Sequence, residues 1–168
     1  LTTGGRVPDI PVYVDSPLAT NVTEAFRLHP ECYDEEILEY INSDPDGNAF
    51  GWPRLRYVRN ADESKALNES KQSAVIIAAS GMCEAGRVLH HLKHQIDDPR
   101  TTVLFVGYQG ENTLGRKILD GQEIVKILGD EYHVRAQIKR ISGYSGHGDH
   151  NDLVGFAHNM VNKPQRTF

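Results

Sequence analysis

Residues 73–80 read SAVIIAAS, a continuous apolar run that leads into the small-residue loop Ser80-Gly81-Met82. Such a run is typical of a β-strand buried on both faces of a sheet. A helical pattern follows from about Cys83 to Ile96, and residues 102–119 repeat the order of apolar strand, glycine-rich loop and helix. Two strand–loop–helix units in succession predict βαβ connections and a mostly parallel sheet.

The flanking segments extend this pattern. Upstream, we expect a strand at 11–15, a helix from 18 to about 28, a helix at 34–41, a strand at 55–58 and a helix at 62–70. Downstream, the β-rich runs 124–129 and 134–141 are joined by residues 130–133, which predicts an antiparallel hairpin. Asp149 or Asn151 is the expected N-cap of a last helix. The predicted fold class is therefore α/β, a mostly parallel sheet flanked by helices with a C-terminal hairpin.

Composition limits the class of protein. The 168 residues are 39% hydrophobic and 24% charged, which fits one ordinary soluble domain and excludes a disordered tail. The longest apolar runs have strand length, so no membrane span is predicted. The two cysteines, Cys32 and Cys83, form no disulfide framework, and a cytoplasmic location is expected. The formal net charge of −5 argues against a surface coated with nucleic acid, but it permits a narrow phosphate site of backbone amides.

Both ends of the sequence suggest a fragment of a longer chain. It begins at Leu1 without an initiator methionine or a signal-peptide pattern. The last segment, residues 163–168, reads as a turn into a strand that stops after two or three residues. We therefore expect further sequence outside these residues.

Three loops occupy places where a strand ends and a helix begins: residues 15–18, 80–82 and 107–116. Each is short or glycine-rich, carries a hydroxyl group and precedes a helix whose free amides and dipole favour an anion. Three such loops predict an extended anionic ligand with several phosphates, bound at the helix start after the second or third loop. Arg87 and Arg116 are expected to add charge-assisted hydrogen bonds.

The same features also have ordinary structural interpretations. The two glycine loops can be turns that require positive φ, and Ser16-Pro17 can be a capping turn with Ser16 as the N-cap. A solvated helix face is favoured over a metal site for His90, His91 and His94, because zinc needs a further ligand and no HExxH pattern occurs. Packing is favoured for Cys83, and loop anchoring for Trp52.

Residues 144–150, YSGHGDH, are the most informative segment. Small residues flank His147 on both sides and leave its imidazole open to close approach. Asp149 and His150 follow within reach, so an acid/base or metal role is chemically reasonable. A structural histidine in a glycine turn is the alternative.

Four stretches carry a resemblance when they are taken together. They are residues 12–19 (VYVDSPLA), 76–82 (IIAASGM), Gly107-Tyr108-Gln109 with Gly115-Arg116, and 145–149 (SGHGD). In this order, the set resembles the β-CASP branch of metallo-β-lactamase-fold nucleases, which includes ribonuclease J and the endonuclease subunit of the eukaryotic pre-mRNA 3′-end cleavage machinery. The resemblance implies a Rossmann-like β-CASP domain over residues 1–141. Residues 142–168 would be a truncated return segment of the metallo-β-lactamase-fold domain, the start of an RNA-specificity segment.

The resemblance also implies roles for individual residues. His147 aligns with the motif B histidine, which protonates the leaving oxygen at the scissile phosphate, and Ser145 would lie beside that phosphate. The residues implied to line the cleft and hold the RNA backbone are Ser16, Ser80, Gly81, Met82, Thr113 and Gly115. Many relatives have Ser-Ala-His-Ala/Thr-Asp where this chain has Ser-Gly-His-Gly-Asp, and the glycines loosen the geometry around His147.

The family's zinc-binding HxHxDH motif does not occur in this sequence. The resemblance therefore implies two zinc ions held by the remainder of the same chain, none held by these residues, and no activity of the fragment by itself. The expected partners are RNA, the metallo-β-lactamase domain of the same chain and a second copy in a homodimer, with no membrane.

The predicted function is RNA clamping within a zinc-dependent ribonuclease that hydrolyses phosphodiester bonds, as an endonuclease or a 5′-to-3′ exonuclease. Two alternatives remain open at this point. One is a non-catalytic α/β module that binds a nucleotide or phosphate. The other is a nuclease of the same fold that acts on DNA, because no motif here reveals contacts to the 2′-hydroxyl.

Overall fold

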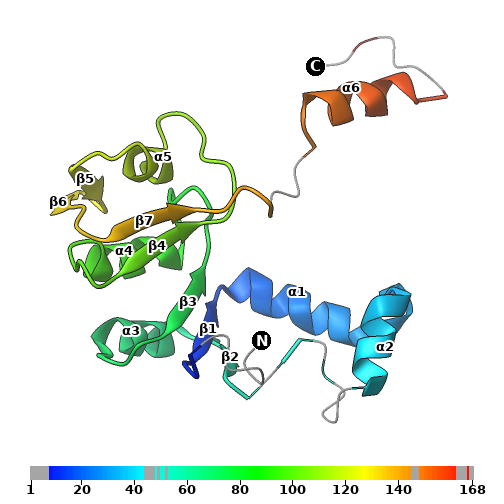
Figure 1. Ribbon diagram of the computed structural model, residues 1–168, viewed down its shortest axis with the longest axis horizontal. Helices are drawn as coiled ribbons and strands as arrows, with labels where there is room; N and C mark the ends of the chain where they lie inside the picture. Colours follow the sequence, from blue (N-terminus) through cyan, green and yellow to red (C-terminus); the bar gives the residue numbers. More distant parts are fainter. Residues whose placement is uncertain are drawn as a thin grey trace.

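The computed structural model describes residues 8–43, 48, 50–51, 53–144, 148–161 and 166. Across these residues the fold is α/β, as predicted, and its strands pair in three groups (Figure 1). Strands β1 (Val12–Asp15), β2 (Leu55–Tyr57) and β3 (Val75–Ala78) form a parallel sheet in the order β2-β1-β3. Strand β4 (Thr102–Phe105) pairs in parallel with β7 (Gln137–Arg140), and β5 (Ile124–Ile127) pairs antiparallel with β6 (Asp130–His133).

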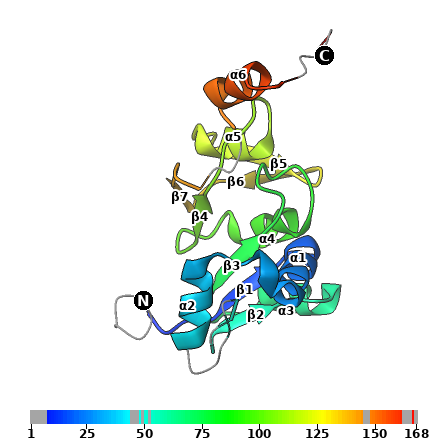
Figure 2. The ribbon, with the colours of Figure 1, turned by 90° about the vertical axis from the view of Figure 1, so that its right-hand side faces the viewer.

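The helices follow the strands in chain order. They are α1 (Pro17–Leu28), the short 3-10 helix η1 (Pro30–Cys32), α2 (Glu35–Ser43), α3 (Ala61–Glu69), α4 (Arg87–Gln95), α5 (Leu114–Leu119) and α6 (His150–His158). Helix α1 runs from the end of β1 away from the sheet toward α2, and α6 stands apart from the sheets in both ribbon views (Figures 1 and 2). None of the helices in the described ranges is long and apolar enough to cross a bilayer.

Local capping explains where several helices begin. Ser16 is the N-cap of α1, with its hydroxyl accepting from Ala19 N and Pro17 in the first turn, so the capping-turn interpretation is confirmed. Asp149 caps α6 in a capping box with Asp152. These starts are readable from the sequence because the cap and the amide it satisfies lie within three residues of each other.

The core lies between α4, α5, the β5–β6 hairpin and the β4–β7 pair. Its most buried members are Ile96, Ile118 and Ile127, each fully buried, with Phe105 and Leu92 beside them. Burial of each such side chain contributes about 1.5–3 kcal/mol relative to exposure. This cluster therefore provides the rigid base from which the loops after β3 and β4 project.

The structure contains an antiparallel hairpin, but the prediction of which segments form it is wrong. The hairpin consists of β5 and β6, and it turns at Leu128-Gly129, where φ is +52° and +96°, as a two-residue turn with two positive φ angles requires. Residues 130–133, expected to be the connection, form β6. The run 134–141 becomes β7 and pairs with β4, with Phe105 opposite Arg140. The two-residue turn matches the right-handed twist of β5 and β6. The backbone N–H and C=O groups of β7 then find their hydrogen-bond partners on β4.

Two further expectations differ from the structure. Helix α4 begins at Arg87 rather than near Cys83, because Cys83 and Gly86 have φ of +59° and +84°, outside the helical region. Strand β3 is not buried on both faces: Val75 and Ile77 point to a face where they are 43% and 52% exposed. Only the opposite face of β3 is covered among the described residues.

Candidate functional site

Two of the three predicted loops start from the same edge of one parallel sheet. Asp15 at the end of β1 is in register with Ala78 at the end of β3, so Ser16 and Ser80 follow neighbouring strand ends. Ser16 is 7% exposed, and its hydroxyl is engaged in the α1 cap. The Ser80 hydroxyl accepts from Ala85 N at 3.3 Å and shapes the turn before α4.

The second and third loops interlock. Gly115 N donates to Met82 O at 3.0 Å, and the buried Gln109 side chain donates to Gly81 O at 2.9 Å. A Cβ on Gly115 would lie 1.9 Å from Gln109 Oε1 and 3.0 Å from Met82 O, so only glycine permits this contact. The structure therefore brings Gly81, Met82 and Gly115 together, while their role toward RNA stays a prediction.

The start of α5 differs from the expected anion site. Leu114 N donates to the Glu84 carboxylate at 2.5 Å, Gly115 N to Met82 O, and Arg116 N to the Thr113 hydroxyl at 3.2 Å. The first-turn amides are thus already satisfied within the chain, and a carboxylate occupies the place foreseen for a phosphate. Thr113 acts as the N-cap of α5, while its role toward a ligand stays a prediction.

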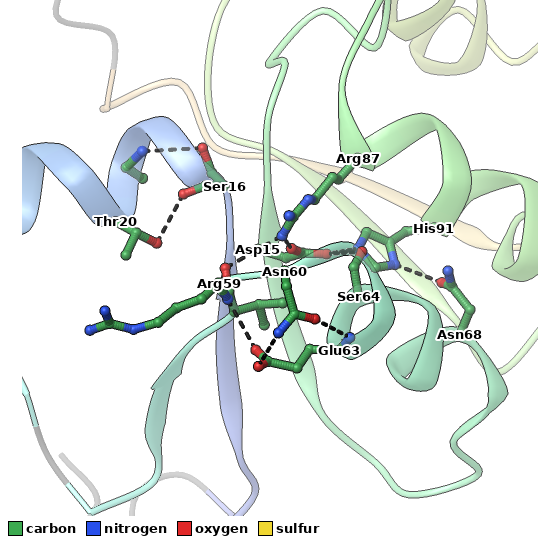
Figure 3. Close-up of polar contacts among 12 residues, drawn as sticks. Asp15, Ser16, Thr20, Arg59, Asn60, Glu63, Ser64, Asn68, Arg87 and His91 are labelled. Atoms are coloured by element: carbon green, nitrogen blue, oxygen red, sulfur yellow. Dashed lines mark hydrogen bonds and ion pairs between the residues drawn. The ribbon is translucent and has the colours of Figure 1, made fainter.

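A buried polar cluster ties α4 and α3 to the end of β1 (Figure 3). Asp15 is fully buried and accepts hydrogen bonds from Ser64 Oγ at 2.5 Å, from His91 Nε2 at 2.7 Å and from Arg87 Nη1. His91 Nδ1 in turn lies 2.7 Å from Asn68 Oδ1. We call these five residues the Asp15 cluster.

The Asp15 cluster has a clear electrostatic consequence. Burial pulls the pKa of Asp15 upward, but the hydrogen bonds from Ser64, Arg87 and His91 outweigh burial and hold that pKa below its usual value. Asp15 is therefore ionised at neutral pH. The Arg87 side chain is 19% exposed and forms an ion pair with this carboxylate. Its role in the structure is therefore to hold α4 against the end of β1.

The three histidines of α4 do not share one environment. His90 and His94 are exposed, as the solvated-face interpretation predicts, but His91 is only 7% exposed and belongs to the Asp15 cluster. That interpretation was therefore wrong for His91. Its position four residues after Arg87 places both side chains on one helix face, which is the sequence signal that identifies it.

Other predicted residues lie elsewhere or outside the described part of the chain. Arg116 is half-buried, with its side chain 43% exposed, and pairs with Asp120 one turn later, at 2.8 Å. Cys83 is 3% exposed within the core, and burial raises its pKa to about 11, which confirms packing. Ser145, His147 and Trp52 fall outside the described residues, so their roles stay predictions.

The described residues do not fit a zinc site. No group of three or more histidine, cysteine, aspartate or glutamate side chains that could hold a metal occurs within them. The fully buried carboxylate of Asp15 is already hydrogen-bonded by a serine, an arginine and a histidine of the same chain.

Residues 1–118 match the Beta-Casp domain family. The chain belongs to this family. Residues 131–168 match a second family, the Zn-dependent metallo-hydrolase RNA specificity domain, which includes β7 and α6. The interlocked loops after β3 and β4 and the Asp15 cluster all lie within the Beta-Casp match.

Among characterised proteins, the chain is similar to Ribonuclease TTHA0252 of Thermus thermophilus, with 38% identity over 153 residues that make up 91% of this chain and 35% of that protein. It is also similar to Transcription termination factor FttA of Methanosarcina mazei, at 29% identity over 98% of this chain and 26% of that protein. FttA of Thermococcus kodakarensis is 30% identical over 94% of this chain and 25% of that protein. The chain thus spans about a quarter to a third of the length of these relatives.

Proposed function

We propose that the protein containing this chain hydrolyses RNA phosphodiester bonds and that this chain holds the RNA. The observation that carries the proposal is the match of residues 131–168 to an RNA specificity domain of metallo-hydrolases, directly after a Beta-Casp domain. The relative named a ribonuclease, at 38% identity, supports RNA hydrolysis over an activity limited to transcription termination.

In this proposal the chain contributes groups to a cleft completed by the rest of the protein. His147 donates a proton to the leaving oxygen, and Ser145 lies beside the scissile phosphate. The interlocked loops around Met82 and Gly115 present a rigid edge to the RNA, because each holds the other in place. Two zinc ions, held elsewhere in the full-length protein, would supply an activated water and stabilise charge on the phosphate.

A cleavage assay tests the proposed activity. The full-length protein with zinc should cleave end-labelled RNA, and His147→Ala should slow cleavage by about 100-fold or more while RNA binding persists. The 168-residue chain alone should show no turnover. Uncleaved RNA with the zinc-loaded full-length protein, or robust turnover by the chain alone, would contradict the proposal.

A binding assay tests the proposed edge separately. Arg116→Glu in the full-length protein should weaken RNA binding and flatten its dependence on salt, because one cationic contact to the backbone is reversed. Arg100→Glu is the matched control, since Arg100 is likewise paired with a nearby aspartate but lies before β4, whereas Arg116 lies in α5 after it. Equal RNA affinity of the two variants would remove Arg116 from the edge.

A further inference from the structure

The side chain of Gln109 links the loop after β4 to the loop after β3. It is 3% exposed, and its Nε2 donates to Gly81 O at 2.9 Å, across a separation of 28 residues in the sequence. The same nitrogen lies 3.1 Å from Tyr108 O and 3.3 Å from Gly107 O, which anchor it in its own loop. One buried amide therefore fixes the direction of the Gly81 carbonyl group.

The orientation of this amide is set by its surroundings. Its Oε1 has no hydrogen-bond partner among the described residues and faces Gly115, where a Cβ would lie 1.9 Å from it. The reverse orientation would point Oε1 at the three carbonyl oxygens, and none of these can donate a hydrogen bond to it. The contribution of Gln109 to the loops therefore comes from the two N–H bonds of Nε2.

The direction of the Gly81 carbonyl group decides where the next N–H group points. The peptide bond between Gly81 and Met82 is trans, and in a planar trans peptide the C=O and N–H groups point to opposite sides. Because Gly81 O faces Gln109, the N–H group of Met82 points away from that side chain. At the next peptide bond, Met82 O accepts from Gly115 N at 3.0 Å, so Met82 is held on both sides.

The N–H group of Met82 is available to a ligand. It donates no hydrogen bond within the described ranges of the chain, and Met82 is 37% exposed. A backbone N–H without a partner in the fold takes its acceptor from water or from a ligand. The guanidinium groups of Arg87 and Arg116 are less available, since each pairs with an aspartate. A neutral backbone donor at this position therefore suits an anion in a chain with a formal net charge of −5.

We propose that Gln109 is a positioning residue for the RNA backbone: it holds the Gly81 carbonyl group inward and so presents the N–H group of Met82 to a phosphate oxygen. This inference rests on the proposed RNA-directed function. Gln109 is too deeply buried to touch the RNA, so it acts through the peptide bond between Gly81 and Met82. Its role differs from that of Gly115, which leaves room for the Gln109 side chain and holds Met82 O.

The test measures binding of a fluorescent oligouridylate of about 12 nucleotides with uncleavable phosphorothioate linkages to the protein that contains this chain. Gln109→Met keeps the approximate length of the side chain but removes its donor, and it should weaken RNA binding by about tenfold. Gln122→Met is the matched control, because Gln122 is exposed between α5 and β5. The thermal midpoint of each variant is measured in parallel.

A pH series with Gln109→Glu separates positioning from a contribution to stability alone. Burial favours the neutral carboxyl group and raises the pKa of the introduced side chain, so it should gain its proton between about pH 9 and pH 6. The carboxylate has no proton to donate to Gly81 O, whereas the protonated group donates again. Relative to the wild type at the same pH, RNA affinity of this variant should therefore rise by about tenfold as the pH falls through this range. Gln122→Glu should show no such rise.

The outcomes separate the inference from the proposed function. If the wild-type protein binds no RNA, the proposed function fails. If it binds RNA and Gln109→Met binds like Gln122→Met, the positioning role is refuted while RNA binding stands. Recovery of the thermal midpoint of Gln109→Glu at low pH without recovery of RNA affinity would show that Gln109 only stabilises the loops, which also refutes the inference. If Gln109→Met does not fold, the pH series decides.

Discussion

Replacement of Asp15 by Asn should loosen the attachment of α4 to the end of β1. The substitution keeps the volume of the side chain but removes its charge, so no cavity forms and the effect is electrostatic. Arg87, 19% exposed, and the buried His91 then face a neutral amide with a single acceptor oxygen. Removal of one partner from a buried ion pair costs about 3–5 kcal/mol, because the remaining charge stays desolvated.

Hydrogen exchange measures this cost locally. A loss of about 3 kcal/mol corresponds to exchange about 100-fold faster at amides of α4 and β1 that exchange by local opening. Asp9→Asn is the matched control: it removes the same charge from an exposed pair with Arg54 and should leave those amides unchanged. Equal exchange rates in the two variants would refute the view that the Asp15 cluster holds these elements together.

Three further predictions follow from individual contacts. The pKa of Asp15 in the folded state is lowered below the reference value of 3.8. Its ionised carboxylate should therefore stabilise the fold fully above pH 3.8, and this contribution should decline as pH falls through the folded pKa. The urea midpoint measured against pH should show the decline in the wild type and not in Asp15→Asn. Gly115→Ala should destabilise the loops by about 1–3 kcal/mol and reduce RNA affinity, because the added methyl group would overlap Gln109. Gly107→Ala is the control, since a Cβ at that position would meet no atom within 4 Å, and it should change neither thermal stability nor RNA binding in the same assays. Iodoacetamide at neutral pH should modify the exposed Cys32 but leave Cys83, whose pKa is raised to about 11, unmodified in peptide mass maps of the native protein; rapid labelling of Cys83 would contradict its burial.

The sequence by itself predicted the local elements well. The strand at β1, the α1 start at Ser16 and the α6 start at Asp149 depend on residues within one turn of each other, and the periodicity of apolar residues records which of them face inward. The family followed from motifs that hold their order along the chain, as the Beta-Casp match over residues 1–118 confirms.

The contacts between segments far apart in the sequence were decided only by the tertiary structure. Residues 134–141 have the same β-rich pattern whether they pair with β5 or with β4, and the choice of β4 depends on a partner more than 30 residues away. The burial of His91 likewise depends on Asp15 and Asn68, which the chain brings to α4 from β1 and α3. The amides of α5 are engaged because Glu84 and Met82 reach them from another loop. Local patterns fix which conformation a segment adopts, but the partner that satisfies its polar groups is chosen when the whole chain packs.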